Sequence, residues 1–388
     1  MNKENRNALL SDVYDFQYGM GNTIEDIGGD YPIYGSNGAV GFTNIFNSED
    51  APVIGHIGAY AGIVNWATGK HFVTYNGVIC RIKKGINPRF GYYLLLHSKL
   101  QKRLRGSTQP FVSYDLLYDV KVFLPNKIIQ NNIASVLTDL DSKIELNNRI
   151  NAELEAMAKT LYDYWFVQFD FPDKNGKPYK TNGGKMVWNE ELKREIPEGW
   201  EVKPLSEITA VSNESVNPMD FPDKEFKYYS IPGFDESGTF NIEKGIEIRS
   251  NKYSIKNTDV LVSKLNPWFS RVIYATNDSD LISSTEFVVF RTENISIKNY
   301  MYMIARDASF VSFCTKSASG TSNSHKRVNP TVMMRYQIVF DETIATLFGN
   351  TIIGSIRMLA KNKIENQKLT ELRDWLLPML MNGQVKVN

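Results

Sequence analysis

Residues 128–167 read IIQNNIASVLTDLDSKIELNNRINAELEAMAKTLYDYWFV, and this stretch decides the fold. It contains neither Gly nor Pro, and its apolar residues recur at spacings of three and four, which is the period of a helix. The spacing predicts one long helix over the whole stretch. Residues 343–377 show the same spacing, so the sequence predicts two long helices in one chain.

The two helices are related by an internal repeat, because adding 215 to the number of each seam residue in the first gives its counterpart in the second. The first seam is Leu137, Leu140, Ile144, Asn147, Asn151, Leu154, Ala158, Leu161 and Trp165, and the second is Ile352, Ser355, Leu359, Asn362, Asn366, Leu369, Arg373, Leu376 and Leu380. Such a seam is typical of a coiled coil. The asparagines Asn147, Asn151, Asn362 and Asn366 are predicted to fix its register, because a buried amide needs a partner across the interface.

Two unrelated amphipathic helices, each packed on its own domain, are the alternative. That arrangement is commoner for any single helix, but it explains the paired asparagines poorly. If the helices pack antiparallel, a pseudo-twofold axis relates the two halves of the chain and places a globular part at each end. A helix of about 40 residues is roughly 60 Å long, so the pair would hold two globular parts at a fixed spacing, as a molecular ruler.

Short strands separated by turns are predicted before each long helix. The first set covers residues 53–54, 62–66, 72–75, 78–82 and 119–124, with a short helix over residues 90–104, and the second covers residues 259–262, 271–274, 287–291 and 336–340. A polar connector follows the first long helix and ends near residues 196–200. The fold class is therefore α+β, with two mixed α/β domains joined by two long helices in an antiparallel coiled coil. The predicted divisions are residues 1–127, 128–196, 197–342 and 343–388: first globular domain, central helical region with connector, second globular domain and distal helical region.

Composition places the chain among ordinary folded proteins. It has 388 residues, 42% of them hydrophobic, and 44 basic against 43 acidic side chains leave a formal net charge of +1. This composition excludes a chain that is mostly disordered. The first residues lack the apolar core of a signal peptide, and we find no run of about 18 apolar residues, so we expect a cytoplasmic protein without a membrane span. Two isolated cysteines, Cys80 and Cys314, allow neither a disulfide framework nor a four-cysteine zinc site.

Charge is distributed unevenly along the chain. Residues 81–121 carry nine basic and two acidic side chains, a local charge of +7, whereas residues 128–169 carry three basic and six acidic ones, a charge of −3. A solvated surface explains such a basic run as well as a ligand does, so the count only modestly favours contacts with phosphates.

Several further stretches occur in a fixed order along nearly the whole chain. They are Tyr31-Pro-Ile-Tyr-Gly-Ser-Asn-Gly38, Leu124-Pro-Asn-Lys-Ile-Ile-Gln-Asn-Asn-Ile133, Leu154-Glu-Ala-Met-Ala-Lys-Thr-Leu-Tyr-Asp-Tyr-Trp-Phe166, Phe171-Pro-Asp-Lys-Asn-Gly-Lys-Pro-Tyr179, Gly183-Gly-Lys-Met-Val-Trp-Asn-Glu190, Ile196-Pro-Glu-Gly-Trp200 and Leu369-Thr-Glu-Leu-Arg-Asp-Trp-Leu-Leu-Pro-Met-Leu-Met-Asn-Gly383. None of these stretches is a chemical motif. Together they resemble the specificity (S) subunits of type I restriction-modification enzymes.

The resemblance implies a non-catalytic DNA-recognition subunit. Its two globular domains would be target recognition domains, each reading one half of a bipartite site in double-stranded DNA, and its helices would bind two modification (methyltransferase) subunits. Restriction subunits, which translocate and cleave DNA, would join some such complexes. No cofactor is expected in this chain, because S-adenosylmethionine, ATP and magnesium would be held by the partner subunits.

Catalytic and metal-binding motifs are absent from the sequence. An adenine methyltransferase needs an Asn/Asp-Pro-Pro-aromatic motif, and Asn266-Pro-Trp-Phe269 lacks the second proline. The stretch Pro222-Asp-Lys-Glu-Phe-Lys227 crowds together the elements of a nuclease site, which indicates a surface turn. No phosphate-binding Gly-x4-Gly-Lys-Ser/Thr loop occurs, and the four histidines show no metal-ligand spacing. We predict neither a catalytic residue nor a metal site.

Candidate DNA contacts are polar residues in glycine-bearing loops, because Arg, Lys, Asn and Gln read base edges while Ser, Thr, Tyr and backbone amides hold phosphates. In the first domain they are Tyr34, Ser36, Asn37, His56, Tyr60, Lys70, His71, Arg103, Arg105, Ser107, Thr108 and Gln109. In the second they are Lys264, Asn266, Arg271, Ser284, Thr285, Thr321, Ser322, Asn323, His325, Lys326 and Arg327. The loop over residues 319–327 is the best single candidate, although an exposed loop without a ligand explains its sequence nearly as well.

Three aromatic residues near the helix ends, Trp165, Phe166 and Trp375, are expected in the core, with partner binding as the alternative. Glu153, Glu155 and Lys159 are expected on the outer side of the first helix, where a modification subunit could meet them. Two other functions stay open: a coiled-coil scaffold that binds protein rather than DNA, and a specificity subunit that serves a fused methyltransferase-nuclease.

Overall fold

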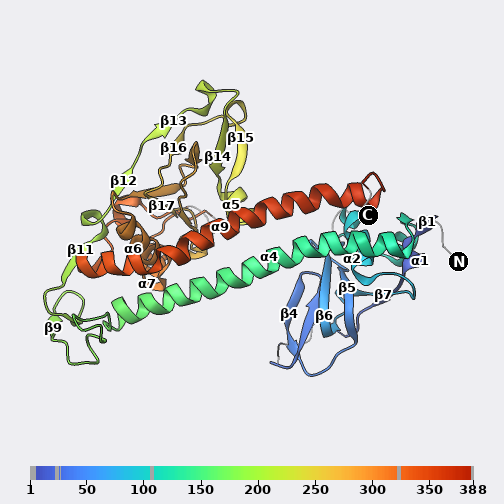
Figure 1. Ribbon diagram of the computed structural model, residues 1–388, viewed down its shortest axis with the longest axis horizontal. Helices are drawn as coiled ribbons and strands as arrows, with labels where there is room; N and C mark the ends of the chain where they lie inside the picture. The colour runs from blue at the N-terminus through green and yellow to red at the C-terminus, as the bar shows by residue number, and fades with distance from the viewer. Residues whose placement is uncertain (1–5, 22–25, 27, 105–108, 321–324, 386–388) are drawn as a thin grey trace. The chain divides into compact units, whose positions relative to one another are not determined.

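A computed structural model describes residues 6–21, 26, 28–104, 109–320 and 325–385 (Figure 1). The chain forms two compact units. One comprises Met1–Ile144 with Leu369–Asn388, and the other comprises Glu145–Lys368. Each unit contains one globular domain of helices and strands together with part of both long helices. The predicted α+β fold class is confirmed.

The long helices are α4 (Lys127–Tyr162), green in Figure 1, and α9 (Glu342–Met381), red in Figure 1. Helix α4 continues into a π-helical turn, Asp163–Val167, so the helix predicted over residues 128–167 is confirmed except for the hydrogen-bonding pattern of its last turn. Helix α9 extends beyond the predicted residues at both ends and contains Pro378. On both helices, no residue of the predicted seam is exposed.

Asparagines meet between α4 and α9 within the second unit, where the two helices run antiparallel. Asn147 Nδ2 donates a hydrogen bond to Asn366 Oδ1 at 2.9 Å, and Asn362 Nδ2 donates one to Asn151 Oδ1 at 2.9 Å. Since 147 + 215 = 362 and 151 + 215 = 366, the repeat exchanges one pair for the other. A pseudo-twofold pairing of the two helices requires this reciprocity. Asn147 Nδ2 also donates a hydrogen bond to Glu365, so this buried amide nitrogen donates two hydrogen bonds across the helix pair.

Aromatic side chains at the end of α4 belong to the core of the second unit. The Trp165 ring centroid lies 5.6 Å from that of Phe348, and the Phe166 centroid lies 4.6 Å from that of Tyr300. The expected core positions of Trp165 and Phe166 are confirmed. For Trp375, which is 55% exposed, the expectation was wrong, because residue 375 falls between the seam positions on the outer side of α9.

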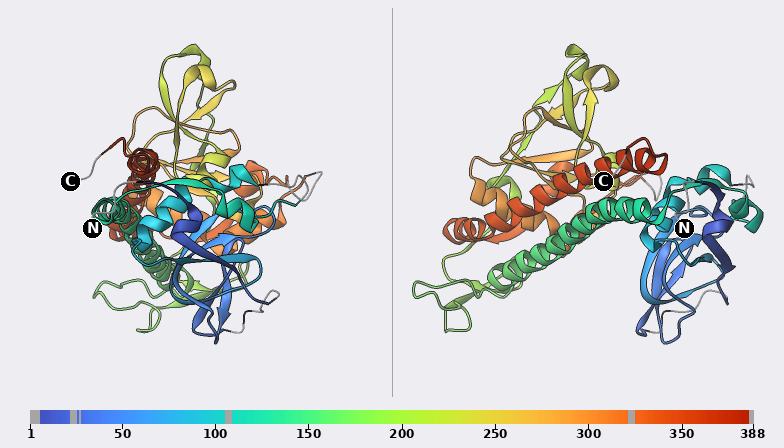
Figure 2. Two further views of the ribbon diagram at one scale, coloured as in Figure 1. Left: turned by 90° about the vertical axis from the view of Figure 1, so that its right-hand side faces the viewer. Right: turned by 45° about the vertical axis from the view of Figure 1, so that its right-hand side comes forward.

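The first globular domain is built on one six-stranded sheet, drawn in blue in Figure 2. Its strands are β2 (Tyr14–Tyr18), β7 (Gly77–Ile82), β5 (Ser48–Gly55), β6 (Val64–Val73), β3 (Tyr31–Gly35) and β4 (Gly38–Thr43), in that order across the sheet. Only β3 and β6 pair in parallel. The two predicted strands at residues 62–66 and 72–75 are one strand, β6.

Helices and a second pair of strands complete the first unit. They are α1 (Leu10–Val13), α2 (Pro88–His97), a 3-10 turn (Leu100–Arg103), α3 (Tyr114–Tyr118), and β1 (Arg6–Leu9) antiparallel to β8 (Lys121–Leu124). Helix α2 begins at Pro88 because Asn87 caps it, accepting a hydrogen bond from the Phe90 amide. The core of this unit joins buried residues of α1 and α2 to Leu137 of α4 and to Leu380 and Met381 of α9.

The second globular domain contains two sheets instead of one. A four-stranded sheet has the order β12 (Ala210–Ser212), β20 (Phe287–Arg291), β17 (Asp259–Ser263) and β18 (Val272–Tyr274). A five-stranded sheet has the order β13 (Ser215–Val216), β16 (Lys252–Ser254), β19 (Leu281–Ser283), β14 (Glu225–Tyr229) and β15 (Asn241–Lys244). None of the five-stranded sheet was predicted.

Short helices surround these sheets. They are α5 (Ile231–Ser237), α6 (Ile295–Arg306), α7 (Ala308–Lys316), α8 (Pro330–Met333) and the 3-10 turns Leu205–Glu207, Pro218–Asp220, Gly245–Glu247 and Pro267–Phe269. As β1 does with β8, the first strand of this domain, β11 (Glu201–Pro204), pairs antiparallel with its last, β21 (Gln337–Phe340). The connector carries one antiparallel hairpin, β9 (Met186–Asn189) with β10 (Arg194–Pro197).

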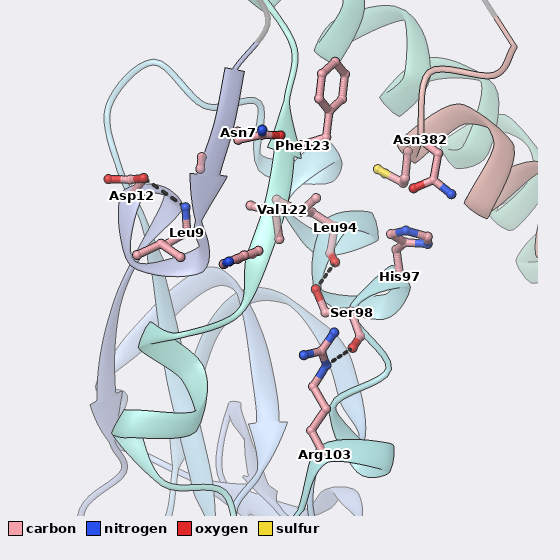
Figure 3. Close-up of a pocket in the computed structure, with 13 residues that line it drawn as sticks. Asn7, Leu9, Asp12, Leu94, His97, Ser98, Arg103, Val122, Phe123 and Asn382 are labelled. Atoms are coloured by element: carbon pink, nitrogen blue, oxygen red, sulfur yellow. Dashed lines mark hydrogen bonds between the residues drawn. The ribbon is translucent and has the colours of Figure 1, made fainter.

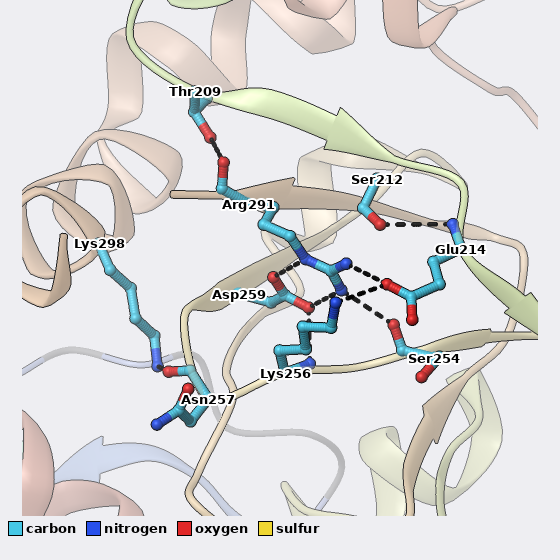
Figure 4. Close-up of polar contacts among 9 residues, drawn as sticks. All are labelled: Thr209, Ser212, Glu214, Ser254, Lys256, Asn257, Asp259, Arg291 and Lys298. Carbon is cyan, nitrogen blue, oxygen red and sulfur yellow. Dashed lines mark hydrogen bonds and ion pairs between the residues drawn. The ribbon is translucent and has the colours of Figure 1, made fainter. Parts of the chain in front are cut away.

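A charged network fixes the four-stranded sheet of the second domain (Figure 4). Arg291 on β20 donates two hydrogen bonds of 2.7 Å to the fully buried carboxylate of Asp259 on β17 and one of 2.6 Å to Glu214. Nearby, Lys298 of α6 donates to the carbonyl oxygens of Asn257 and Ala275, each at 2.5 Å. Burial lowers the pKa of Lys298 to about 7, against the opposing attraction of Asp259. Lys298 therefore ties α6 to the segment before β17 and to the residue that follows β18.

The described residues include one helix of membrane-spanning length and no group of metal-binding side chains. Helix α9 is long and apolar enough to span a membrane by length and composition, which is weak evidence because core helices meet the same criterion. Its residues Ala345, Phe348 and Ile352 are buried in the core of the second unit. Within the described ranges, no three His, Cys, Asp or Glu side chains are grouped as a metal site requires.

Candidate nucleic-acid interface

Three predicted loops of the second domain meet beyond the ends of β17 and β20. The Lys264 amide donates to the Glu286 carbonyl oxygen at 2.9 Å, and the Val328 amide donates to the Lys264 carbonyl oxygen at 3.0 Å. Asn266 and Lys326 are joined twice, by the Asn266 amide to the Lys326 carbonyl at 2.7 Å and by the Lys326 amide to Asn266 Oδ1 at 3.0 Å. Residues far apart in sequence thus form one platform, which we call the second reading platform.

Two arginines of this platform are held by carboxylates. Arg327 pairs with Glu286 through two contacts of 2.9 and 3.2 Å, which raises the pKa of its guanidinium. Arg271 pairs with Asp235 through contacts of 2.6 and 2.7 Å and lies against the Phe269 ring. The Arg327 side chain is 46% exposed and that of Arg271 only 11%, so Arg327 is the more accessible of the two.

The remaining predicted residues of the second domain differ in accessibility. Thr285 and His325 are exposed, whereas Lys264, Asn266, Ser284 and Lys326 are half-buried. Ser284 Oγ accepts a hydrogen bond from the Glu286 amide at 3.2 Å, which orders that turn. Thr321, Ser322 and Asn323 lie outside the described residues. Their predicted role in DNA binding stays a prediction.

In the first domain, the loops after β3 and β5 and the segment around Gln109 are brought together. Ser36 Oγ donates to the Asn76 carbonyl oxygen at 2.6 Å and accepts from the Ile57 amide at 3.3 Å. The Gly58 amide donates to the Pro110 carbonyl oxygen at 2.9 Å, which brings in the segment next to Gln109. These contacts frame a cleft of about 340 Å³ lined by Tyr18, His56, Ile57, Tyr75, Gln109 and Phe111. We call this the first reading platform.

Stacked aromatic rings form part of the first reading platform. The Tyr18 ring lies between His56 and Tyr114, with centroid distances of 4.3 and 4.1 Å. His56 is buried, and its Nδ1 lies 2.9 Å from the Tyr75 carbonyl oxygen, an arrangement that assigns the ring a packing role. Asn37, Tyr60 and Gln109 are exposed at the rim.

His71 has no exposed surface from which to contact DNA. It is fully buried, and its ring meets the edge of Tyr34 at a centroid distance of 5.5 Å. Burial lowers its pKa, against the effect of a 2.9 Å contact with the Gly69 carbonyl oxygen. Its neighbour Lys70 is exposed, with its ammonium 4.7 Å from the centre of the Phe46 ring.

Arg103 lies in a different pocket of the first unit (Figure 3). This pocket has a volume of about 600 Å³ and is also lined by Asn7, His97, Lys121 and Asn382. Arg103 Nε donates to the Ser98 carbonyl oxygen at 3.2 Å, which turns the guanidinium toward α2. The predicted contacts Arg105, Ser107 and Thr108 lie outside the described residues.

Sequence reasoning missed the aromatic part of the first platform. Tyr18, Tyr75 and Phe111 line its cleft, and Tyr75 and Phe111 are 48% and 45% exposed. An exposed ring beside a turn, as in Tyr75-Asn-Gly77, is the signal that could have identified it. In the second domain, the contact between Glu286 and Arg327 was not predicted.

Comparisons with known proteins agree on one family. Residues 10–156 match the type I restriction modification DNA specificity domain. The chain is 25% identical over 331 residues to the type I restriction enzyme MjaIX specificity subunit of Methanocaldococcus jannaschii, covering 79% of this chain and 71% of that protein. It is 24% identical over 362 residues to the HindI specificity subunit of Haemophilus influenzae, covering 77% of each.

A solved structure shares the fold. The S subunit of a type I restriction-modification system from M. genitalium superposes with a TM-score of 0.62 at 16% identity, and the match covers 97% of this chain and 96% of that one. The sequence matches point to the same family that the ordered stretches resemble, and the solved structure shows that the fold is shared. In sequence and in fold, the chain is similar to the specificity subunits of type I restriction-modification systems.

Proposed function

We propose that this protein is the non-catalytic reader of a bipartite DNA target, with each reading platform contacting one half of the site. The proposal rests on a repeat whose halves have diverged. The two long helices share reciprocal asparagine pairs, whereas the two platforms are built from different residues. A repeated scaffold would present two readers to one duplex, as dimeric DNA-binding proteins do with half-sites. Different loop chemistry would make the two halves of the target unlike.

The repeat also supports docking of two identical modification subunits. Met157 on α4 is 65% exposed, and its repeat counterpart, Leu372 on α9 (157 + 215 = 372), is 43% exposed. Exposed apolar side chains at equivalent positions are what two copies of one partner would bind. Trp375, one helical turn after Leu372, adds a large aromatic side chain of the kind found at the centre of interfaces.

Of the acidic residues expected to meet a modification subunit, Glu155 is already engaged within the second unit. It pairs with Arg306 at 2.8 Å and with Lys363 at 3.7 Å. Glu153 and Lys159 are exposed, and Lys159 pairs with Asp163. We therefore assign docking to the apolar positions of the helices and leave only Glu153 and Lys159 among the charged candidates.

Catalysis is assigned to the partner subunits. In this proposal the modification subunits hold S-adenosylmethionine and methylate adenine, and restriction subunits, where present, hold ATP and magnesium. The chain itself supplies the recognition surface and the spacing, and it works in the cytoplasm, where the target DNA is accessible.

The test is to coexpress the chain with its neighbouring methyltransferase subunits and map methylated adenines in genomic DNA by single-molecule sequencing. We expect one asymmetric two-part motif with a fixed gap. Replacing Arg327 and Lys326 by alanine should change the half read by the second domain only, and the matched change of Asn37 and Gln109 should alter the other half only.

Other outcomes would select other functions. Methylation without a two-part motif, or the absence of a complex, would overturn the proposal and favour a scaffold that binds protein. Copurification of a single chain that carries both methyltransferase and nuclease activities would instead identify the fused system.

A further inference from the structure

A cleft of about 580 Å³ lies beside the second reading platform. It is bounded by β12, by β20, by Lys264 after the end of β17, and by the turn that begins α8. Its lining includes the apolar side chains of Val211, Val289 and Met334, and the polar side chains of Ser206, Ser212, Asn213, Asn329 and Thr331. The polar side chains could form hydrogen bonds with a polar ligand.

The charge of this cleft is of one sign. Its charged lining residues are Lys264 and Arg335, and no Asp or Glu in the described part of the chain lines it. Two cations without a nearby carboxylate create a positive local potential, which favours the binding of an anion.

These two cations differ from the arginines of the second reading platform. Arg271 and Arg327 are each paired with a carboxylate, whereas Lys264 and Arg335 take part in no ion pair with any residue that the structure describes. A phosphate that approached Arg271 would have to displace Asp235. The same phosphate would meet Lys264 and Arg335 without such competition.

The cleft and the platform share their backbone. Lys264 lines the cleft, and its amide and carbonyl groups bond to Glu286 and Val328 of the platform at 2.9 and 3.0 Å. Asn329, the next residue along the chain, also lines the cleft and accepts a hydrogen bond from the Thr331 amide at 2.8 Å. An anion held in the cleft would thus lie at a fixed place relative to Arg327.

From these observations we propose that the cleft binds the phosphodiester backbone of DNA, with Lys264 and Arg335 as its charged contacts. The inference rests on the proposed function and divides the work of the second domain. The cleft would position the duplex without regard to sequence, while Arg327 and its neighbours would read bases.

The experiment uses the full complex of the chain with its modification subunits. Binding to a target duplex and to an unrelated duplex is measured by fluorescence anisotropy between about 50 and 200 mM salt, the range over which phosphate contacts dominate the response. For Arg335→Ala and Lys264→Ala we expect weaker binding to both duplexes by the same factor. Each loss should reduce the slope of log K against log[salt] by about 0.9. For Arg335→Ala, whose residue is not part of the second reading platform, the methylated motif should also stay unchanged.

Two variants act as controls. Arg335→Lys keeps the charge and should keep the slope. Lys244→Ala removes an exposed lysine of β15 that does not line the cleft, and it should leave the slope unchanged. Arg335 is exposed, so Arg335→Ala is expected to fold. If Lys264→Ala fails to fold, the result for Arg335→Ala alone tests the proposal.

An unchanged salt slope for Arg335→Ala, or a changed methylation motif, would overturn the cleft proposal. A wild-type complex without a two-part motif would instead overturn the proposed function, so the two failures are distinguishable.

Discussion

The two globular domains hold the loops of their platforms together by different chemistry. In the first, Tyr18 stacks between His56 and Tyr114, and neutral hydrogen bonds of Ser36 join the loops. In the second, the equivalent support comes from ion pairs, with Arg327 on Glu286 and Arg271 on Asp235. Aromatic stacking is insensitive to salt and pH, whereas exposed ion pairs are screened by salt. The two globular domains of one chain can therefore respond differently to salt and to pH.

The largest loss of stability is expected when the buried ion pair of the second domain is broken. Asp259 is fully buried and accepts two of the hydrogen bonds that the Arg291 guanidinium donates. Asp259→Ala leaves that cation without its main partner, so we expect the free energy of unfolding of the second unit to fall by about 3–5 kcal/mol. Urea denaturation measures the loss. Lys256→Ala, which removes only an exposed partner of Glu214, should cost less than about 1 kcal/mol, and equal losses in the two variants would contradict the prediction.

The aromatic support of the first domain is tested by Tyr18→Leu. This change removes two stacked contacts while keeping an apolar side chain, so we expect a loss of about 1–3 kcal/mol in the free energy of unfolding of the first unit. The loss should be the same in low and high salt. Tyr60→Leu, at a position that is 45% exposed, is the matched control with little effect. A loss that shrinks as salt rises would show that the support is electrostatic after all.

A dependence on pH is expected for the second domain through Lys298. Burial lowers its pKa to about 7 from the ordinary 10.5, so between these values the unfolded chain binds a proton that the folded chain does not. The free energy of unfolding should therefore rise with pH above 7, by at most about 1.4 kcal/mol per unit. Lys298→Met should remove this slope. A difference between wild type and variant that does not vary with pH would mean that the two carbonyl oxygens keep the lysine protonated.

The smallest effect is expected at the surface of the second platform. The Glu286 and Arg327 side chains are 27% and 46% exposed, so Glu286→Gln should lower the free energy of unfolding by less than about 1 kcal/mol, and by still less in high salt. Thermal denaturation at two salt concentrations measures it. A loss above about 2 kcal/mol would show that this pair, like the buried one, carries stability.

The long helices could be predicted because periodicity is a local property of the sequence. The seam around Asn147 and Asn151 follows directly from spacing and from the repeat. The candidate loops were chosen for their glycines and polar residues, and the structure brings several of the described ones together. Whether a polar residue in such a loop is buried was not predictable. His56 and His71 are enclosed by rings from other parts of the sheet, which no local pattern reveals.

The missed sheet has a similar cause. Strands β13 and β19 contain two and three residues, too few to show an alternation of apolar and polar positions. The ion pairs depend on the tertiary fold as well, because Arg271 lies 36 positions from Asp235 and Arg327 lies 41 from Glu286. Pairing across such distances is set by the fold and could not be assigned beforehand.

The shared core of the first unit has a consequence for the order of folding. Leu137 of α4 and Leu380 of α9 belong to the same buried cluster, although they lie 380 − 137 = 243 positions apart. During synthesis the first domain leaves the ribosome long before Leu380 and Met381 are made. Until then, the apolar surface that these residues cover stays exposed. Contacts between such distant residues form slowly, and a surface exposed in the meantime favours aggregation. Stability of the first domain is thus completed by α9, a helix that is translated only after the whole second domain.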